Sequence, residues 1–216
     1  MRALANIQLL LLALANISLI EASSKAQSVT CGSVVKLLNV DYRTRLHSHD
    51  VKYGTGSGQQ SVTGVENSDD VNSHWVIKGK TNIVCDRGTV VKCGDTIRLQ
   101  HLETKKNLHS HFFNSPLSGN QEVSAYGDET GEGDTGDHWE VICYGEEWLR
   151  DLKVQLRHVD TRKFLGASGR SFGRPISGQM EIVGLNSGGT GSEWQSVEGI
   201  FIHPTEFIQQ NIHTEL

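Results

Sequence analysis

The stretch Leu46-His47-Ser48-His49 returns as Leu108-His109-Ser110-His111, and this repetition decides the fold. Another leucine stands nine residues before the leucine that opens each stretch, and a Val or Ile stands two residues before that. A third copy without the histidines keeps this spacing. The three copies are Val35-x-Leu37 with Leu46, Ile97-x-Leu99 with Leu108, and Val154-x-Leu156 with Leu165. Self-similarity of this kind is typical of a repeat architecture.

Two further anchors recur in every copy. One is a glycine followed by strand-like text, at 58–62 (GQQSV), 119–123 (GNQEV) and 178–182 (GQMEI). The other is a closing tryptophan, Trp75, Trp139 or Trp194. Between these anchors, residues alternate between apolar and polar over short runs, which indicates half-buried strands. We expect about four short strands in each copy.

Three such units fit a solenoid, a three-bladed propeller or a β-trefoil. A solenoid needs atypical capping repeats, and none is visible, while three blades close poorly into a ring. A barrel with pseudo-threefold symmetry buries the leucines and tryptophans and removes sheet edges. We therefore predict an all-β chain that forms one β-trefoil from repeats 26–80, 88–143 and 144–199, with the three tryptophans in its core.

Both ends of the chain carry targeting features. Arg2 and the apolar run at 9–15 (LLLLALA), followed by small residues, predict a signal peptide over 1–24 with cleavage within 22–26. The alternative, a membrane anchor, needs a longer unbroken apolar run, and no other segment could span a bilayer. The tail 203–216 ends in His213, Thr214, Glu215 and Leu216, which matches the HDEL class of retrieval signal except at Thr. We expect the lumen of the endoplasmic reticulum, with partial secretion.

Four cysteines suit that oxidising compartment. Cys31 lies six residues before Leu37 and Cys93 six before Leu99, so cysteines bracket the first two units. Joining each unit's start to its end would pair Cys31 with Cys85 and Cys93 with Cys143. A zinc site is the rival interpretation, but the spacing lacks CxxC pairs.

Composition narrows the class of partner. The formal net charge is -5, and nucleic-acid binding requires a basic face, so we expect no nucleic-acid partner. A hydrophobic fraction of 37% with 21% charged residues is ordinary for a globular domain.

Long runs of the chain resemble the stromal cell-derived factor two family, which consists of three MIR repeats. The matching text lies at 30–39 (TCGSVVKLLN), 56–64 (GSGQQSVTG), 116–125 (PLSGNQEVSA) and 173–179 (GRPISGQ). The resemblance implies a luminal β-trefoil that partners a J-domain co-chaperone and Hsp70 and keeps misfolded client proteins soluble, within the unfolded protein response and degradation of misfolded proteins. It also implies a link to O-mannosylation, since MIR repeats occur in protein O-mannosyltransferases.

The histidine motifs are the main candidates for chemistry. Residues two apart on a strand face the same way, so His47 with His49, or His109 with His111, form pairs that could hold a metal, with Asp50 as an added oxygen ligand. The plainer interpretation is partly exposed histidines at a strand-to-turn junction, and we expect no metal and no cofactor. The candidate partner or ligand surface consists of His47, His49, Asp50, Tyr53, His109, His111 and Phe112, with Phe113 beside them.

Other motifs point away from catalysis. The glycines at 54–58 lack the spacing of a phosphate loop, and the acidic run 128–137 lacks the ligand offsets of a calcium loop. We interpret that run as a solvated insertion. Neither GxSxG nor HExxH is present, so no catalytic residue is predicted. The candidate functions are a chaperone-complex subunit and a lectin-like glycan binder or O-mannosylation accessory; autonomous mannosyl transfer would need a membrane domain.

Overall fold

The computed structural model describes residues 28–205 apart from residues 129, 175 and 177. The expected signal peptide, the cleavage site and the last four residues of the tail lie outside this part of the chain. Within it, regular structure consists of twelve antiparallel strands and two short 3-10 helices, η1 (Val71–Ser73) and η2 (Thr135–Asp137). No helix of residues 28–205 has the length and apolar character that crossing a membrane requires.

Each repeat contributes four strands. The first supplies β1 (Val34–Asn39), β2 (Arg45–Lys52), β3 (Gln60–Val65) and β4 (Trp75–Gly79). The second supplies β5 (Thr96–His101), β6 (Asn107–Asn114), β7 (Gln121–Tyr126) and β8 (Trp139–Cys143). The third supplies β9 (Val154–His158), β10 (Phe164–Ser171), β11 (Met180–Leu185) and β12 (Trp194–Ile200).

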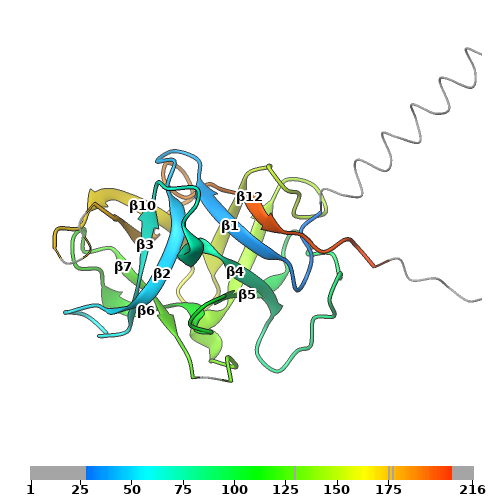
Figure 1. The fold of residues 1–216 in the computed structure, drawn as a ribbon, viewed down its shortest axis with the longest axis horizontal. Helices are drawn as coiled ribbons and strands as arrows, with labels where there is room; N and C mark the ends of the chain where they lie inside the picture. The colour runs from blue at the N-terminus through cyan, green and yellow to red at the C-terminus, as the bar shows by residue number, and fades with distance from the viewer. Residues whose placement is uncertain (1–27, 129, 175, 177, 206–216) are drawn as a thin grey trace, which may run out of the picture.

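Six strands, two from each repeat, close into a barrel (Figure 1). β1 pairs with β12 and β4, β5 pairs with β4 and β8, and β9 pairs with β8 and β12. Because the ring is complete, each barrel strand has a partner on both sides, and the edge groups that would otherwise recruit another strand are used.

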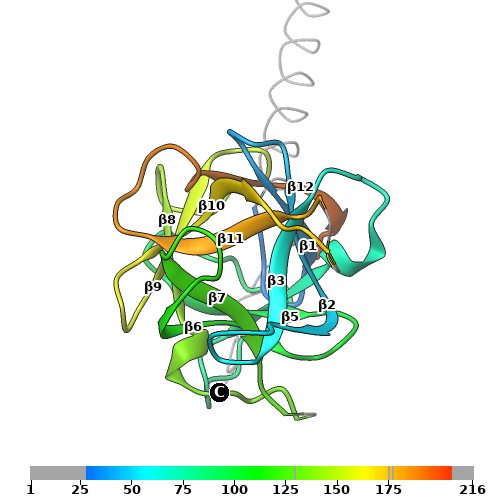
Figure 2. The ribbon, with the colours of Figure 1, turned by 90° about the vertical axis from the view of Figure 1, so that its left-hand side faces the viewer.

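The other six strands form three hairpins that cap one end of this barrel. β2 pairs with β3, β6 with β7, and β10 with β11. The second strands of the hairpins then pair with one another, so that β3, β7 and β11 make the triangle that faces the viewer in Figure 2. A six-stranded barrel closed by a hairpin triplet is a β-trefoil, so the predicted fold class is confirmed.

Equivalent apolar positions of the three repeats fill the core, as predicted. The leucines and tryptophans that define the repeat are fully buried. Each indole also ties the fourth strand of a repeat to its second strand, because its Nε1 donates to a leucine carbonyl. These bonds join Trp75 to Leu46 (2.8 Å), Trp139 to Leu108 (2.9 Å) and Trp194 to Leu165 (2.9 Å).

β5 is buried on both faces, whereas the alternating pattern predicts a half-buried strand. Arg98 and Gln100, on the outer face, are only 5% and 6% exposed. Arg98 donates to the carbonyls of Gly79 (2.8 Å) and Gly131 (3.0 Å), and Gln100 donates to that of Lys105 (2.8 Å). The connection that carries Gly131 lies over this face, so the polar side chains are buried with partners.

Consecutive repeats are joined by one recurring polar contact. The last residue of each first strand donates a side-chain N–H to a backbone carbonyl three residues before a closing tryptophan. The three bonds run from His101 Nε2 to Asn72 O (2.9 Å), from His158 Nε2 to Gly136 O (2.8 Å) and from Asn39 Nδ2 to Gly191 O (2.7 Å). An imidazole or an amide therefore serves equally at this junction.

Burial keeps the two junction histidines neutral. The ring of His101 meets that of Trp75 edge-on at 5.1 Å between centroids, and His158 meets Trp139 in the same way at 4.9 Å. Burial lowers the pKa of His101 to about 4, and burial also lowers the pKa of His158. The neutral ring suits the contact, since Nε2–H donates to Asn72 O while Nδ1 accepts from Thr104 N (3.3 Å).

Replacing Trp139 with Phe tests the indole bond. We expect the free energy of unfolding to fall by about 3 kcal/mol, because ring volume is lost and Leu108 O stays buried without its donor. Trp148 is the matched control: it is fully buried, but its Nε1 has no hydrogen-bond partner among the described residues. Trp148→Phe should lose about 1–2 kcal/mol from volume alone. Urea unfolding measures both, and equal losses would contradict the assignment.

Replacing His101 with Asn tests the junction. The folded-state pKa of His101 lies below the ordinary value of 6.5, so its stabilising contribution is complete above pH 6.5 and is lost as pH falls towards 4. The loss amounts to on the order of 3 kcal/mol at pH 4. Asn does not titrate, and Asn39 already makes the same bond. His101→Asn should therefore fold at pH 7 and lose less stability on acidification.

Urea midpoints between pH 7 and pH 4 measure this difference. His203→Asn is the control, because His203 is exposed. An identical decline with pH in the wild type and His101→Asn would rule out the junction as a source of acid sensitivity.

Candidate functional site

The Leu-His-Ser-His motifs lie in β2 and β6, the first strands of two cap hairpins. We expected these histidines at the surface, and this is wrong for the first of each pair, since His47 is 4% exposed and His109 is 6% exposed. His49 and His111 are half-buried, and Asp50 is exposed beside them. Connections later in each repeat cover the first histidines, and the local sequence does not reveal such cover.

In the first repeat the motif forms a chain of hydrogen bonds. Asp70 Oδ2 lies 2.8 Å from His47 Nδ1, and His47 Nε2 lies 2.7 Å from His49 Nδ1. Burial opposes ionisation of Asp70, but hydrogen bonds from Ser73 and His47 outweigh it and lower its pKa. Burial lowers the pKa of His49, with His47 adding to the effect. Ser73 Oγ donates to Asp70 (2.6 Å) and not to a histidine, so this set lacks the activated hydroxyl of a catalytic triad.

In the second repeat the structure brings His109 together with Asp134 and Asp137. Asp137 Oδ1 lies 2.9 Å and Asp134 Oδ1 3.6 Å from His109 Nδ1, and ligand atoms of the three lie within 4.8 Å of one another. The interpretation of 128–137 as a solvated insertion is wrong for Asp137, which is fully buried, whereas Asp134 is exposed. One imidazole and two carboxylates are of a type that binds divalent metals.

Structural roles account for these two carboxylates. Together they form the capping box of η2: Asp134 accepts from Gly136 N (2.8 Å), and Asp137 accepts from Asp134 N (3.0 Å). Asn107 Nδ2 donates to Asp137 as well, at 3.1 Å. A Cβ at Gly136 would lie 2.3 Å from His109 Cε1, so glycine is needed for this close approach. The cluster is thus a helix cap closed on His109.

The two aromatic candidates differ in exposure, since Tyr53 is buried and Phe112 is exposed. Tyr53, expected at the surface, is buried at 7% exposure, and its hydroxyl donates to Val62 O (2.8 Å) and Val123 O (3.0 Å). Burial raises the pKa of Tyr53 far above its ordinary range. Phe112 is 86% exposed, as expected. It borders a shallow pocket of about 240 Å³ together with Phe113, Asn114, Asn120, Lys163 and Asn186.

Sequence reasoning missed two buried carboxylates that clamp loops of the preceding repeat. Glu122 accepts from the backbone N (3.3 Å) and the hydroxyl of Ser57, and lies 3.1 Å from His111 Nε2. Glu181, at the equivalent position, accepts from Leu117 N (2.8 Å) and Ser118 N (3.2 Å). The sequence does contain a signal for these carboxylates, because Glu122 and Glu181 stand at equivalent positions of two repeated strands.

The cysteines form the disulfides Cys31–Cys85 and Cys93–Cys143, in the pairing that the repeats predict. No cysteine of the chain is left free for zinc, because all four are used. The first disulfide ties the long connection between β4 and β5 to the segment that precedes β1.

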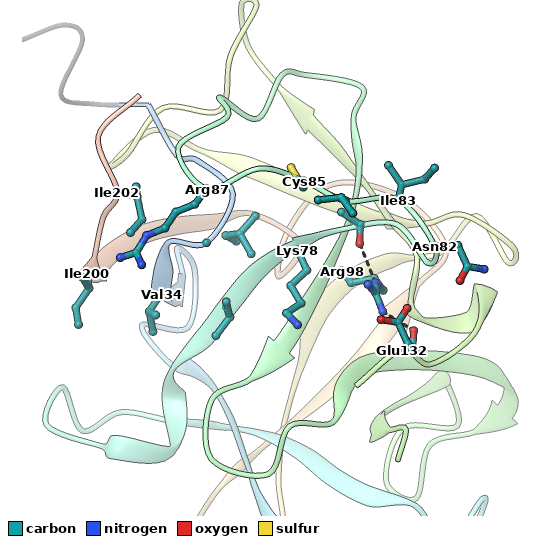
Figure 3. A pocket seen from close by; sticks show the side chains of 15 residues that line it. Val34, Lys78, Asn82, Ile83, Cys85, Arg87, Arg98, Glu132, Ile200 and Ile202 are labelled. Carbon is teal, nitrogen blue, oxygen red and sulfur yellow. Dashed lines mark hydrogen bonds between the residues drawn. The ribbon is translucent and has the colours of Figure 1, made fainter. Parts of the chain in front are cut away.

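That connection borders a groove of about 660 Å³ (Figure 3), which lies at the start of β1 and the end of β4. Its floor is the outward face of β1 and β4, where Val34 and Val76 lie. Ile83 lies on one side of the groove and Ile200 with Ile202 on the other. Val84, which follows Ile83 in the chain, also lines the groove. Lys78, Asn82, Arg87, Arg98 and Glu132 are the polar and charged side chains of the lining.

Both walls are held in place. Cys85, next to Val84, is bonded to Cys31, and Gly88 N donates to Cys31 O (3.0 Å). The opposite wall is fixed at Ile202, whose N–H donates to Ser33 Oγ (3.0 Å) and whose carbonyl accepts from Thr30 Oγ1 (2.7 Å). The groove therefore exists before anything binds. Its lining residues do not belong to the recurring leucine, glycine and tryptophan positions of the repeats, and they come from separate segments of the chain. No local sequence pattern therefore predicts the groove.

A six-stranded barrel closed by three like hairpins places the chain in the class of β-trefoil repeat modules. Its family follows from likeness to known proteins. The MIR domain family matches residues 29–170. Stromal cell-derived factor 2 from Bos taurus is 56% identical over 90% of this chain and 92% of its own length. Human stromal cell-derived factor 2-like protein 1 is 56% identical over 85% of this chain and 83% of its own length.

Solved structures agree. The SDF2-like protein from Arabidopsis thaliana is 44% identical with a TM-score of 0.80, covering 83% of this chain and 99% of the other. A Caenorhabditis elegans protein described as of unknown function is 58% identical with a TM-score of 0.78, covering 81% and 98%. The chain belongs to the stromal cell-derived factor 2 family of MIR-domain proteins.

A substitution at Asp137 separates the capping role from metal binding. Asp137→Asn should lower the free energy of unfolding by about 2 kcal/mol. The carboxylate now accepts hydrogen bonds from N–H groups, and a buried amide nitrogen would instead face those donors. Asp134→Asn, at an exposed cap position where Asn also serves, should change it by less than about 0.5 kcal/mol. Urea unfolding measures both. Zinc or calcium that raised the wild-type midpoint, but not that of Asp137→Asn, would contradict the capping interpretation.

Proposed function

We propose that the chain is a non-enzymatic quality-control factor of the endoplasmic reticulum lumen. In this proposal it is a subunit of a J-domain co-chaperone and Hsp70 complex and keeps misfolded proteins soluble, within the unfolded protein response and degradation of misfolded proteins. The observation that carries the proposal is the match to stromal cell-derived factor 2 over nearly the whole chain. The predicted signal peptide and the HTEL tail support the compartment, with partial secretion because Thr214 replaces the usual Asp.

The described residues support a binding role. The histidine–carboxylate pairs Asp70–His47 and Asp137–His109 have structural roles, because their hydrogen bonds hold the short helices η1 and η2 against the cap hairpins. By contrast, the outer side of the barrel presents aliphatic side chains to solvent along the groove, with Val84 87% exposed. Exposed apolar surface of this kind marks sites of protein contact.

One observation favours a second candidate, a glycan-binding module or an accessory of O-mannosylation. The Saccharomyces cerevisiae protein O-mannosyltransferase Pmt1–Pmt2 complex bound to the sugar donor contains a chain that is 26% identical to this one, with a TM-score of 0.70. The match covers 85% of this chain and 28% of that chain. The exposed ring of Phe112 beside amide side chains offers the stacking surface and polar groups that a sugar requires.

A crosslinked pull-down from microsomes separates the two functions. With the tail intact, the chain should recover a luminal J-domain protein and Hsp70, unchanged by prior glycan cleavage and by Phe112→Ala. Mass spectrometry identifies the recovered proteins. Recovery of glycoproteins alone, lost after glycan cleavage and in Phe112→Ala, would replace the chaperone-complex proposal by the glycan-binding one.

A further inference from the structure

The groove beside β4 combines an apolar lining with an excess of positive charge. It combines an aliphatic floor and walls with three basic side chains, Lys78, Arg87 and Arg98, and one acidic side chain, Glu132. The whole chain has a formal net charge of -5, so an excess of positive charge in the groove is a local feature. Such a surface attracts a partner that is both apolar and acidic.

Two of these basic groups are available to a partner. Arg98 is engaged, since its guanidinium donates to the carbonyls of Gly79 and Gly131 and to that of Glu132. Lys78 and Arg87, in contrast, make no ion pair with any residue of the described part of the chain. An acidic segment that follows the groove would therefore meet two positive charges without breaking an existing ion pair.

The aliphatic side chains are equally unpartnered. Val84 and Ile200, on opposite walls, are 87% and 68% exposed. Covering them removes apolar surface from water, which is the main driving force for association. Because the disulfide Cys31–Cys85 and the bonds to Ile202 already fix the walls, little ordering opposes binding.

The barrel strands under the groove exclude one binding mode. β4 pairs with β1 on one side and β5 on the other, so an added strand finds no free edge there. Recognition must instead come through side chains that enter from the open side. Alternating apolar and acidic side chains of an extended chain match walls that carry isoleucine and valine around Lys78 and Arg87.

We infer that this groove binds an extended polypeptide segment in which aliphatic residues flank an Asp or a Glu, as an unfolded client protein would present. The inference rests on the proposed function, and it names the client surface and the sequence preference that the proposed function leaves open.

Fluorescence anisotropy tests the inference on the full chain with its disulfides formed. The probes are labelled Val-Asp-Val-Gly-Ile-Asp-Val-Gly and the same peptide with Lys in place of Asp. The acidic peptide should bind about tenfold more tightly than the basic one, with added salt reducing the difference. Lys78→Glu combined with Arg87→Glu should reverse this preference. Val84→Asp and Ile200→Asp, on separate walls, should each weaken binding of the acidic peptide about tenfold.

Matched controls lie outside the groove. Lys52→Glu makes one equivalent charge change at an exposed position, and Val71→Asp alters a valine on η1 that is 70% exposed, close to the 68% of Ile200; neither should change affinity by more than about twofold. Thermal unfolding confirms that each variant is folded. Unchanged affinity in the folded groove variants overturns the inference. Peptide binding that appears only when residues 206–216 are removed also overturns it, because this chain's own tail would then be the occupant.

Light scattering from citrate synthase that aggregates on heating, without reductant and with Cys31–Cys85 intact, separates this inference from the proposed function. Suppression by the wild type that is lost in the groove variants supports both. Suppression retained in those variants overturns the groove as the client site and leaves the proposed function standing. Tight peptide binding without any suppression by the wild type supports the groove and contradicts the proposed function.

Discussion

The hydrogen bond from a buried tryptophan indole to a leucine carbonyl is the contact on which each repeat depends. An indole N–H without a partner in the core would carry the full penalty of desolvation, and the leucine carbonyl of a cap strand would carry its own. Pairing the two removes both penalties and ties a barrel strand to the hairpin of the same repeat, as Trp139 does with Leu108. The junction contacts of His101, His158 and Asn39 then join each repeat to the next.

The same contact explains why the architecture was predictable. Trp75, Trp139 and Trp194 follow their leucines by 29, 31 and 29 residues, so the partners of the bond recur at nearly the same spacing, which can be recognised in the sequence. The disulfide pairing follows from the same periodicity, because Cys31 and Cys93 open successive units. Burial of His47 and Arg98 was not predictable, since the residues that cover them come from connections whose paths no local pattern specifies.

Where the repeats diverge, equivalent positions show which contacts the fold requires. His47 and His109 correspond to Gly166 in the third repeat, so the buried histidine–carboxylate pair is dispensable for a trefoil hairpin. The junction position tolerates an exchange of imidazole for amide but keeps its donor in all three repeats. The histidine pairs are therefore better understood as local devices that position η1 and η2 than as remnants of a symmetric ligand site.

The groove lies where the threefold pattern ends. Residues 80–95 between β4 and β5 form a longer connection than residues 144–153 between β8 and β9, and the third repeat continues into the chain's C-terminal segment. Because the barrel and its cap satisfy their own backbone groups, such connections can vary without endangering the frame. The disulfide Cys31–Cys85 anchors this loop to the segment before β1, and Val84 beside it is exposed. A rigid scaffold can in this way hold apolar side chains in water, which a flexible loop would bury against itself.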